Sequence, residues 1–216
     1  FISLSNIVVT RTAYRLTDKM HEDHPEAIGQ LSKGHAYDMA TNIFDRLPQI
    51  FFDAKPTDGN DYIRILGRTN NERAYKYVRR DYVNKVKNLD KFKLFIPKAN
   101  GIGAFGEVIS SPITATPGVG STETFLSIGI LDSEYEMGAA LKYIKTKFAR
   151  ALLGVLKTTQ DITPDKWKYV PLQDFTAHSD IDWSKSVAEI DRQLYRKYDL
   201  AADEIEFIET HVKEMA

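Results

Sequence analysis

Hydrophobic and polar residues alternate over short stretches in the first two thirds of the chain. YIRIL at 62–66 alternates as a β-strand does, and FKLFI at 92–96 is mostly apolar with two aromatic residues. PTDGND at 56–61 combines Pro, Asp and Gly and predicts a turn before the first strand. The β-branched and turn residues of 107–133 predict two or three more short strands. We therefore expect a sheet region over this part of the chain.

The pattern changes at about residue 133, where apolar residues begin to recur at steps of three and four. This spacing predicts one helix from about 133 to 157, with Ser133 or Asp132 as its cap and with a stripe formed by Met137, Leu141, Ile144, Phe148, Leu152 and Val155. Two more amphipathic helices are expected over 183–198 and 203–215.

Because strands precede helices instead of alternating with them, the predicted fold class is α+β. We expect a mixed or antiparallel sheet region, then a long amphipathic helix, then a C-terminal helical pair. The expected division is a domain over 1–175 and a helical extension over 176–216 packed on it.

Other segments have weaker patterns. The polar stretch 17–36 predicts an exposed loop with one short helix, and 50–52 and 167–172 predict short strands. His21 and His24 lie in the polar stretch without a third candidate ligand nearby, so we expect no metal site there.

Composition excludes several classes of protein. The 216 residues are 43% hydrophobic, which supports a buried core, and the absence of cysteine excludes disulfides and thiolate metal sites. No apolar run has the roughly 20 residues of a membrane span, so we expect a cytoplasmic protein without a membrane partner. The first residue is Phe1 and not Met, so we expect a part of a longer protein.

Charge is distributed unevenly along the chain, although the net formal charge is −1. Residues 61–160 carry 16 Lys or Arg and 9 Asp or Glu, a balance of +7. Residues 1–60 carry 6 and 8, and residues 161–216 carry 7 and 13, so the flanks have balances of −2 and −6. A basic middle indicates a polyanion as partner, and a surface of mixed charges is the plain alternative.

GIGAFG at 101–106 matches the nucleotide-binding pattern G-x-G-x-x-G, with glycines Gly101, Gly103 and Gly106. A dinucleotide site needs a helix that opens at the last glycine, but 107–112 is β-branched and ends in proline. A protein kinase needs catalytic and metal-binding motifs downstream, and the sequence contains neither. Two interpretations remain: a tight structural turn, or a loop that approaches another ligand.

Further catalytic motifs are missing. The sequence has no Pro-Pro pair, hence no Asn-Pro-Pro-aromatic site for a flipped base, and no phosphate-binding P-loop. Pro164-Asp165 lacks the second carboxylate and the lysine that a nuclease site requires. We therefore expect no catalytic residues and no cofactor in this chain.

Two groups of basic residues suit a nucleic acid. The predicted helix 133–157 carries five cations on and beside one face and ends in Thr158, Thr159 and Gln160; the cations are Lys142, Lys145, Lys147, Arg150 and Lys157. Such a helix can lie along a phosphate backbone, and glutamine can pair with adenine, whereas a solvated helix face is the alternative. A second group mixes cations with Tyr75, Tyr77 and Tyr82 and consists of Arg64, Arg68, Arg73, Lys76, Arg79 and Arg80.

Four ordered blocks together carry a resemblance to a known family. They are KFKLFIPKANGIGAFGE, PGVGSTETFLSIG, LKYIKTKFARALLGVLKTTQD and YVPLQDFT, and the closing DIDWSKSVAEIDRQLYRKYDLAADEIEFIETHVKEM adds to them. Residues 60–216 resemble the C-terminal part of bacterial adenine-N6 DNA methyltransferases of the fused type II restriction–methylase class. The opening FISLSNIVVTR is similar to the entry of that region more loosely. Ala201 departs from the pattern, because a capping Ser or Thr is expected there.

The resemblance implies a target-recognition region that reads double-stranded DNA. The methylase core, with S-adenosylmethionine and the catalytic motif, would lie N-terminal to this piece and be its partner. The piece alone would be inert, and the resemblance leaves open whether the whole enzyme also cleaves DNA.

These inferences select the residues expected to contact DNA. Base contacts are expected from the glycine loop and the end of the basic helix, namely from Lys98, Asn100, Thr159 and Gln160. Phosphate contacts are expected from Arg68, Arg73, Lys145, Lys147 and Arg150. A different hypothesis is a protein–protein module that couples methylase and restriction subunits through the C-terminal helices, and a third is an enzyme with an unrecognised site.

Overall fold

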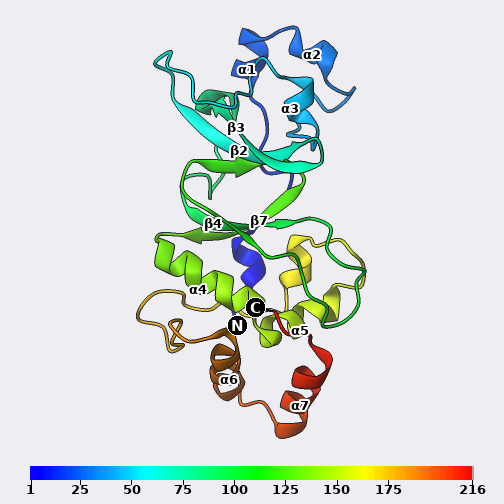
Figure 1. The fold of residues 1–216 in the computed structure, drawn as a ribbon, viewed down its shortest axis with the longest axis vertical. Helices are drawn as coiled ribbons and strands as arrows, with labels where there is room; N and C mark the ends of the chain where they lie inside the picture. The colour runs from blue at the N-terminus through cyan, green and yellow to red at the C-terminus, as the bar shows by residue number, and fades with distance from the viewer. Residues whose placement is uncertain (216) are drawn as a thin grey trace.

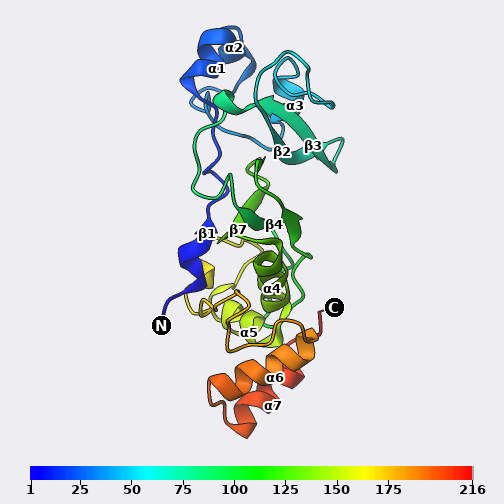
Figure 2. The same cartoon turned by 90° about the vertical axis from the view of Figure 1, so that its left-hand side faces the viewer.

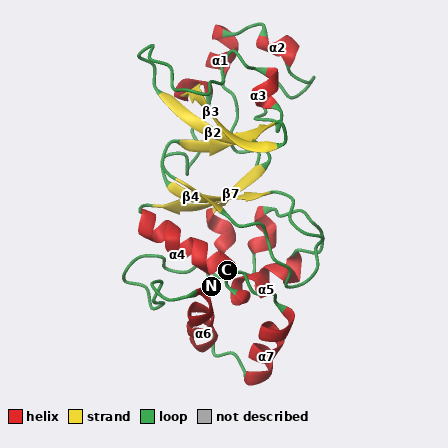
Figure 3. Cartoon of the chain, viewed as in Figure 1, coloured by secondary structure: helices red, strands yellow, loops and turns green. Residues whose placement is uncertain are grey.

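A computed structural model describes residues 1–215 as two lobes stacked along one long axis (Figure 1). The first lobe contains the short N-terminal helices and one sheet, and the second contains another sheet and the C-terminal helices (Figure 3). Each lobe has its own core of buried apolar side chains. The predicted α+β class is confirmed.

The first lobe is built on a three-stranded sheet in the order β3-β2-β6. Strands β2 (Tyr62–Thr69) and β3 (Glu72–Arg79) form a hairpin whose turn residues, Asn70 and Asn71, have φ of 50° and 64°. Asparagine tolerates this left-handed conformation, so the sequence Asn-Asn suits a tight hairpin turn. Strand β6 (Val119–Ser121) runs parallel to β2, and the short helices α1 (Asp18–Asp23), α2 (Ala27–Gln30) and α3 (Ile43–Arg46) complete the lobe.

The second lobe begins with a four-stranded antiparallel sheet in the order β1-β7-β4-β5. Its strands are β1 (Val8–Val9), β4 (Phe92–Pro97), β5 (Ile113–Ala115) and β7 (Phe125–Leu131). The strand predicted over 92–96 is therefore present and pairs with the strand that closes the predicted β-rich region.

This sheet lies between the first lobe and the helices of the second lobe (Figure 2). Its strands contribute buried side chains to both cores. Successive side chains of a strand point to opposite faces. Accordingly, Leu94 and Ile96 of β4 belong to the second-lobe core, whereas Phe95 between them belongs to the first-lobe core. Strand β7 behaves in the same way, with Phe125 in one core and Leu126 in the other.

The face toward the first lobe also carries a buried polar network. Tyr14 donates to Asn88 Oδ1 at 2.7 Å, and the Asn88 amide donates to Ser127 Oγ at 2.8 Å and to the Gly129 carbonyl at 3.2 Å. Lys93 is fully buried, and its ammonium donates to backbone carbonyls of Leu89, Lys91 and Thr116, at 3.1, 2.7 and 3.3 Å. The donors and acceptors of this network lie partly on the sheet and partly on the segment that connects the lobes. The network therefore holds that segment against the sheet.

The predicted long helix 133–157 is two helices, α4 (Glu134–Lys145) and α5 (Lys147–Leu156). The break is at Thr146, which has extended backbone angles and accepts from Ala149 N as the cap of α5. The buried carboxylate of Asp191 accepts from Lys147 N and Phe148 N, the first two free amides of α5, at 3.0 and 2.9 Å. The apolar period continues across the break, so the hydrophobic pattern alone does not reveal it.

The C-terminal helices α6 (Val187–Lys197) and α7 (Ala202–His211) pack on this lobe. Ile190, Leu194 and Met215 are buried in the same core as the sheet, and Lys142 on α4 donates to three carbonyls over 183–185. Residues after 175 therefore pack in the same core as the sheet. At Ala201, where a capping hydroxyl is absent, the Glu204 carboxylate accepts the Ala201 amide at 2.8 Å.

Three local predictions differ from the structure. Residues 50–52 contain an isolated bridge between Phe52 and Tyr77 instead of a strand. Residues 167–172 follow a 3-10 turn, η3 (Pro164–Trp167), and make only the bridge from Pro171 to Ser3. The polar stretch 17–36 contains two short helices instead of one, α1 and α2. Two further 3-10 turns are η1 (Leu4–Ile7) and η2 (Arg80–Tyr82).

Because Lys93 is buried, we expect the free energy of unfolding to depend on pH in the alkaline range. Burial lowers the pKa of Lys93 from 10.5 to about 8, although the charge of Asp90 opposes the shift. Between these two values the unfolded chain binds more protons than the folded one, so the free energy of unfolding should rise with pH by up to about 3 kcal/mol. Urea unfolding of wild type and Lys93→Met at pH values from 8 to 10.5 should show this rise in the wild type and its loss in the variant.

The matched control is Lys85→Met, which removes an exposed lysine from the segment that connects the lobes. It should leave the wild-type profile unchanged. A Lys93→Met profile that runs parallel to wild type would contradict the assignment.

Candidate nucleic-acid interface

The glycine loop and the segment after α5 lie side by side. A bridge joins Ala99 to Asp161, Asn100 N donates to the Gln160 carbonyl at 2.7 Å, and Ile162 N donates to the Lys98 carbonyl at 2.7 Å. Segments about 60 positions apart in sequence thus form one short ladder. The structure brings the predicted base-contacting residues onto neighbouring backbones.

The three loop glycines have conformations and surroundings that exclude other residues. Gly101, Gly103 and Gly106 have φ of 57°, 89° and 69°, in the left-handed region that favours glycine. A Cβ on Gly103 would lie 2.5 Å from the backbone of Thr159, and one on Gly106 would lie 2.2 Å from the His211 carbonyl oxygen. The glycines therefore let the loop pack against the end of α5 and the end of α7.

Glu107 occupies the concave side of this loop. Its carboxylate accepts Ile102 N at 2.9 Å and Gly103 N at 3.0 Å, and it pairs with the buried ammonium of Lys157. Lys157 also donates to the Asn100 carbonyl at 2.9 Å. Successive backbone amides of this kind form a concavity that binds anions. Here the anion is supplied by the chain itself, so the loop amides are not available to a phosphate.

Burial opposes ionisation of Glu107, but Lys157 and the two amides outweigh it, so the pKa of Glu107 lies below its usual value. Sequence analysis missed this residue. A usable signal was present, because Glu107 is the sole acidic residue between Asp90 and Glu123, directly after the last loop glycine.

The predicted base-contacting residues differ in accessibility. Thr159 and Gln160 are exposed and Lys98 is half-buried at the surface. Asn100 is buried, and its side chain donates to the Pro97 carbonyl and accepts Ser110 N at 2.7 Å. The expectation for Asn100 must be corrected: its amide is used to fold the loop and does not face a ligand.

Two predicted phosphate contacts on α5 are also used internally. Arg150 is 2% exposed, and its guanidinium donates to the carbonyls of Lys145, Glu107 and Lys213. Lys147 pairs with Glu209 of α7 at 2.5 Å. After the break at Thr146, α5 has a direction in which Arg150 is buried and Lys147 faces α7. Helix α5 therefore does not offer the continuous basic face that the sequence predicts. Lys145, at the end of α4, is half-buried.

Arg68 and Arg73 lie opposite each other next to the hairpin turn, and both are exposed. Strand β2 runs parallel to β6, which leads through 122–124 into β7, and Phe125 at the start of β7 pairs with Pro97 at the end of β4. The ends of β2 and β4 therefore lie at the same edge of the molecule, together with the hairpin turn and Lys98.

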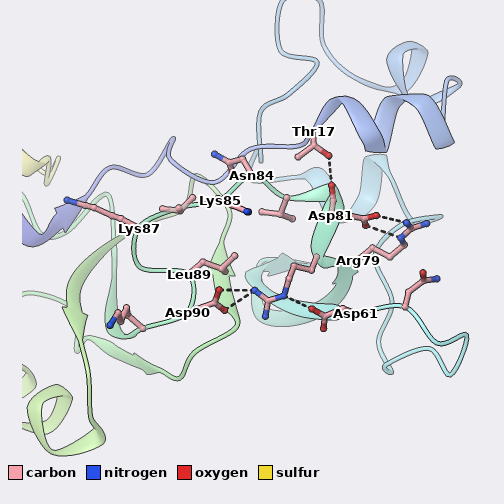
Figure 4. A pocket seen from close by; sticks show the side chains of 14 residues that line it. Thr17, Asp61, Arg79, Asp81, Asn84, Lys85, Lys87, Leu89 and Asp90 are labelled. Atoms are coloured by element: carbon pink, nitrogen blue, oxygen red, sulfur yellow. Dashed lines mark hydrogen bonds and ion pairs between the residues drawn. The ribbon is translucent and has the colours of Figure 1, made fainter.

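A cavity of about 760 Å³ lies along the connection between the lobes (Figure 4). It is lined by Thr17, Asn60 and Asp61 and by residues 79–81, 83–87 and 89–91. Its two arginines are neutralised by neighbouring carboxylates. Arg80 pairs with Asp61 at 2.6 Å and with Asp90 at 2.8 Å, and Arg79 pairs with Asp81 at 2.5 Å. Arg80, from the predicted second basic group, thus ties the connecting segment to the first lobe, whereas Arg79 of the same group pairs within the first lobe.

The described residues 1–215 hold no group of three or more His, Asp or Glu side chains suited to a metal ion. Within the same residues, no helix has the length and apolar character needed to cross a bilayer. No family model, no curated protein and no solved structure matches this chain.

The Glu107–Lys157 pair should be important for stability. Glu107→Gln leaves the buried Lys157 ammonium without its counter-ion, and loss of one partner of a buried pair costs about 3–5 kcal/mol. The Glu107→Gln/Lys157→Met double variant should recover part of that loss, since it no longer buries a lone charge. Urea unfolding at neutral pH measures both.

The control pair is Lys91 and Asp132, which lies at the surface. Asp132→Asn should cost less than about 1 kcal/mol. An equally small cost for Glu107→Gln would show that the loop does not depend on its internal carboxylate.

Proposed function

We propose that this chain is a sequence-specific DNA-recognition module. It would contact duplex DNA with the edge that contains the hairpin turn and the paired segments 98–100 and 160–162. Following the resemblance described above, it would position a target adenine for a methylase core that uses S-adenosylmethionine. That core would be its natural partner, and the chain itself would carry no catalytic residue.

One observation carries the proposal: Lys98, Thr159 and Gln160 come from distant segments and meet on adjacent backbones at the surface. Lysine, threonine and glutamine side chains supply hydrogen-bond donors and acceptors for base edges, and glutamine matches adenine in the major groove. A rigid ladder beneath them favours specificity, because the side chains need little ordering when DNA binds.

Exposed cations at the same edge give additional support. Arg68 and Arg73 stand exposed on the hairpin. Arg68 donates one hydrogen bond to the Asn71 carbonyl in the turn, and the remaining guanidinium donors of both residues can pair with phosphates. Arg150, Asn100 and Lys147 are left out of the proposed interface, because their polar groups already have partners within the chain.

Binding should depend steeply on salt. Fluorescence anisotropy with a labelled pool of random-sequence duplexes should show affinity at low salt, with log K falling linearly against log salt concentration. Arg68→Ala and Arg73→Ala should each reduce the magnitude of that slope by about 1, since each removes one phosphate contact. Selection of preferred sequences from the pool should then show relaxed preference for Gln160→Ala, by about 1–3 kcal/mol at one base pair.

Lys33→Ala is the matched control, because Lys33 is an exposed cation in the first lobe outside the proposed edge. It should leave both slope and preference unchanged. Absence of binding to the pool at low salt would refute the proposal, and so would equal losses in Lys33→Ala and Arg68→Ala.

A further inference from the structure

An apolar groove runs between α5 and α7, on the side of the glycine loop. It has a volume of about 490 Å³ and is lined by Phe105, Phe148, Ala151, Leu152, Val155, Leu200, Asp203, Glu204, Phe207 and Ile208. Eight of these ten residues are apolar. The groove is formed by the glycine loop, by α5 and by α7 with Leu200 just before it, and other contacts hold these segments together.

Large apolar side chains are exposed along the groove. Val155 on α5 is 54% exposed and Phe207 on α7 is 48% exposed. Phe105 reaches the groove from the glycine loop, and its ring centroid lies 5.6 Å from that of Phe207. Single exposed apolar residues are ordinary, but a contiguous set in a concave site indicates a binding surface.

The groove is preformed. Lys213 N donates to the Gly106 carbonyl oxygen at 2.9 Å, which fixes the loop to the segment that follows α7. Gly154 of α5 lies directly under the Phe105 ring, since a Cβ there would come within 2.9 Å of that ring. The Lys147–Glu209 pair joins α5 to α7 on one side. A partner would therefore meet a ready surface and would not have to order it.

The charges around the groove favour a partner of positive charge. Both charged residues that line it, Asp203 and Glu204, are acidic. The cations of α5 do not offset them. Arg150 and Lys157 are buried on internal partners, and Lys147 is paired with Glu209.

We propose that this groove binds an amphipathic helix of a partner protein, with its apolar side in the groove and Lys or Arg along the flank that faces α7. A third helix laid between two helices matches the helix-in-groove mode of recognition. No residue that lines the groove is among those proposed to contact DNA, and the groove does not depend on DNA binding.

A model peptide tests this directly. The probe is a fluorescein-labelled Leu/Lys amphipathic peptide of about 15 residues, long enough to form a helix on binding. A Leu/Glu peptide with the same apolar positions is the matched comparison. Anisotropy titration should show saturable binding of the Leu/Lys peptide and at least about tenfold weaker binding of the Leu/Glu peptide, since acidic residues line the groove.

Variants locate the site. Phe207→Ala should weaken the Leu/Lys peptide about tenfold or more, as expected when a central aromatic contact is removed. Ile102→Ala removes an apolar side chain that is 84% exposed on the same loop but outside the groove, and it should have no effect. Asp203→Asn should reduce the preference for Leu/Lys over Leu/Glu, whereas Glu204 is left unchanged because it also caps α7.

Three results would overturn the proposal. The first is equal binding of both peptides, which would indicate an unselective apolar surface. The second is an equal effect of Ile102→Ala and Phe207→Ala. The third is self-association of the unliganded chain that Phe207→Ala abolishes in sedimentation experiments, because the occupant would then be a second copy. Circular dichroism of each variant verifies that a loss of binding is not a loss of folding.

Discussion

The pairing of β4 with β7, buried on both faces, is the constraint on which the rest of the structure depends. Leu94 and Ile96 serve one core and Phe95 the other, so a shift of register by one residue would exchange the two sets. Both lobes take their orientation from this sheet. The position of the edge proposed for DNA follows from the ends of its strands.

Several cations of the basic middle segment act as internal donors to backbone carbonyls. Lys93 donates to carbonyls of the segment that connects the lobes, and Lys142 donates to carbonyls of the segment before α6. Arg150 donates to carbonyls at the end of α4, after the glycine loop and in the C-terminal segment. A buried carbonyl without a partner is costly, and a long basic side chain can satisfy two or three of them at once. The net charge of a segment therefore overstates the charge that its surface can present to a polyanion.

The glycine loop has the backbone geometry of an anion-binding loop, but a side chain of the same chain occupies the anion position. Its glycines adopt the left-handed conformations that an anion-binding loop uses, and its amides converge on an anion. That anion is the Glu107 carboxylate, held by Lys157. Of the two interpretations open from the sequence, the structural turn accounts for all three glycines, while Lys98 beside the loop remains available to a ligand.

The sequence alone determined the α+β class, the strand over 92–96, the hairpin strand at 62–66 and the stretches that become α4 to α7, because these depend on local periodicity and turn chemistry. It also determined that Lys98, Thr159 and Gln160 are polar residues next to strand and helix ends. The tertiary structure decided which polar groups stay accessible. Asn100 and Arg150 are polar residues of types that usually lie at the surface, but both are buried here. The Asn100 side chain hydrogen-bonds within its own loop, to Pro97 and Ser110, and Arg150 donates to the carbonyl of Lys213, 63 positions away. The break at Thr146 likewise depends on Asp191, which lies 45 positions later in the chain. Such choices depend on contacts between remote segments, and periodicity within one segment carries no information about them.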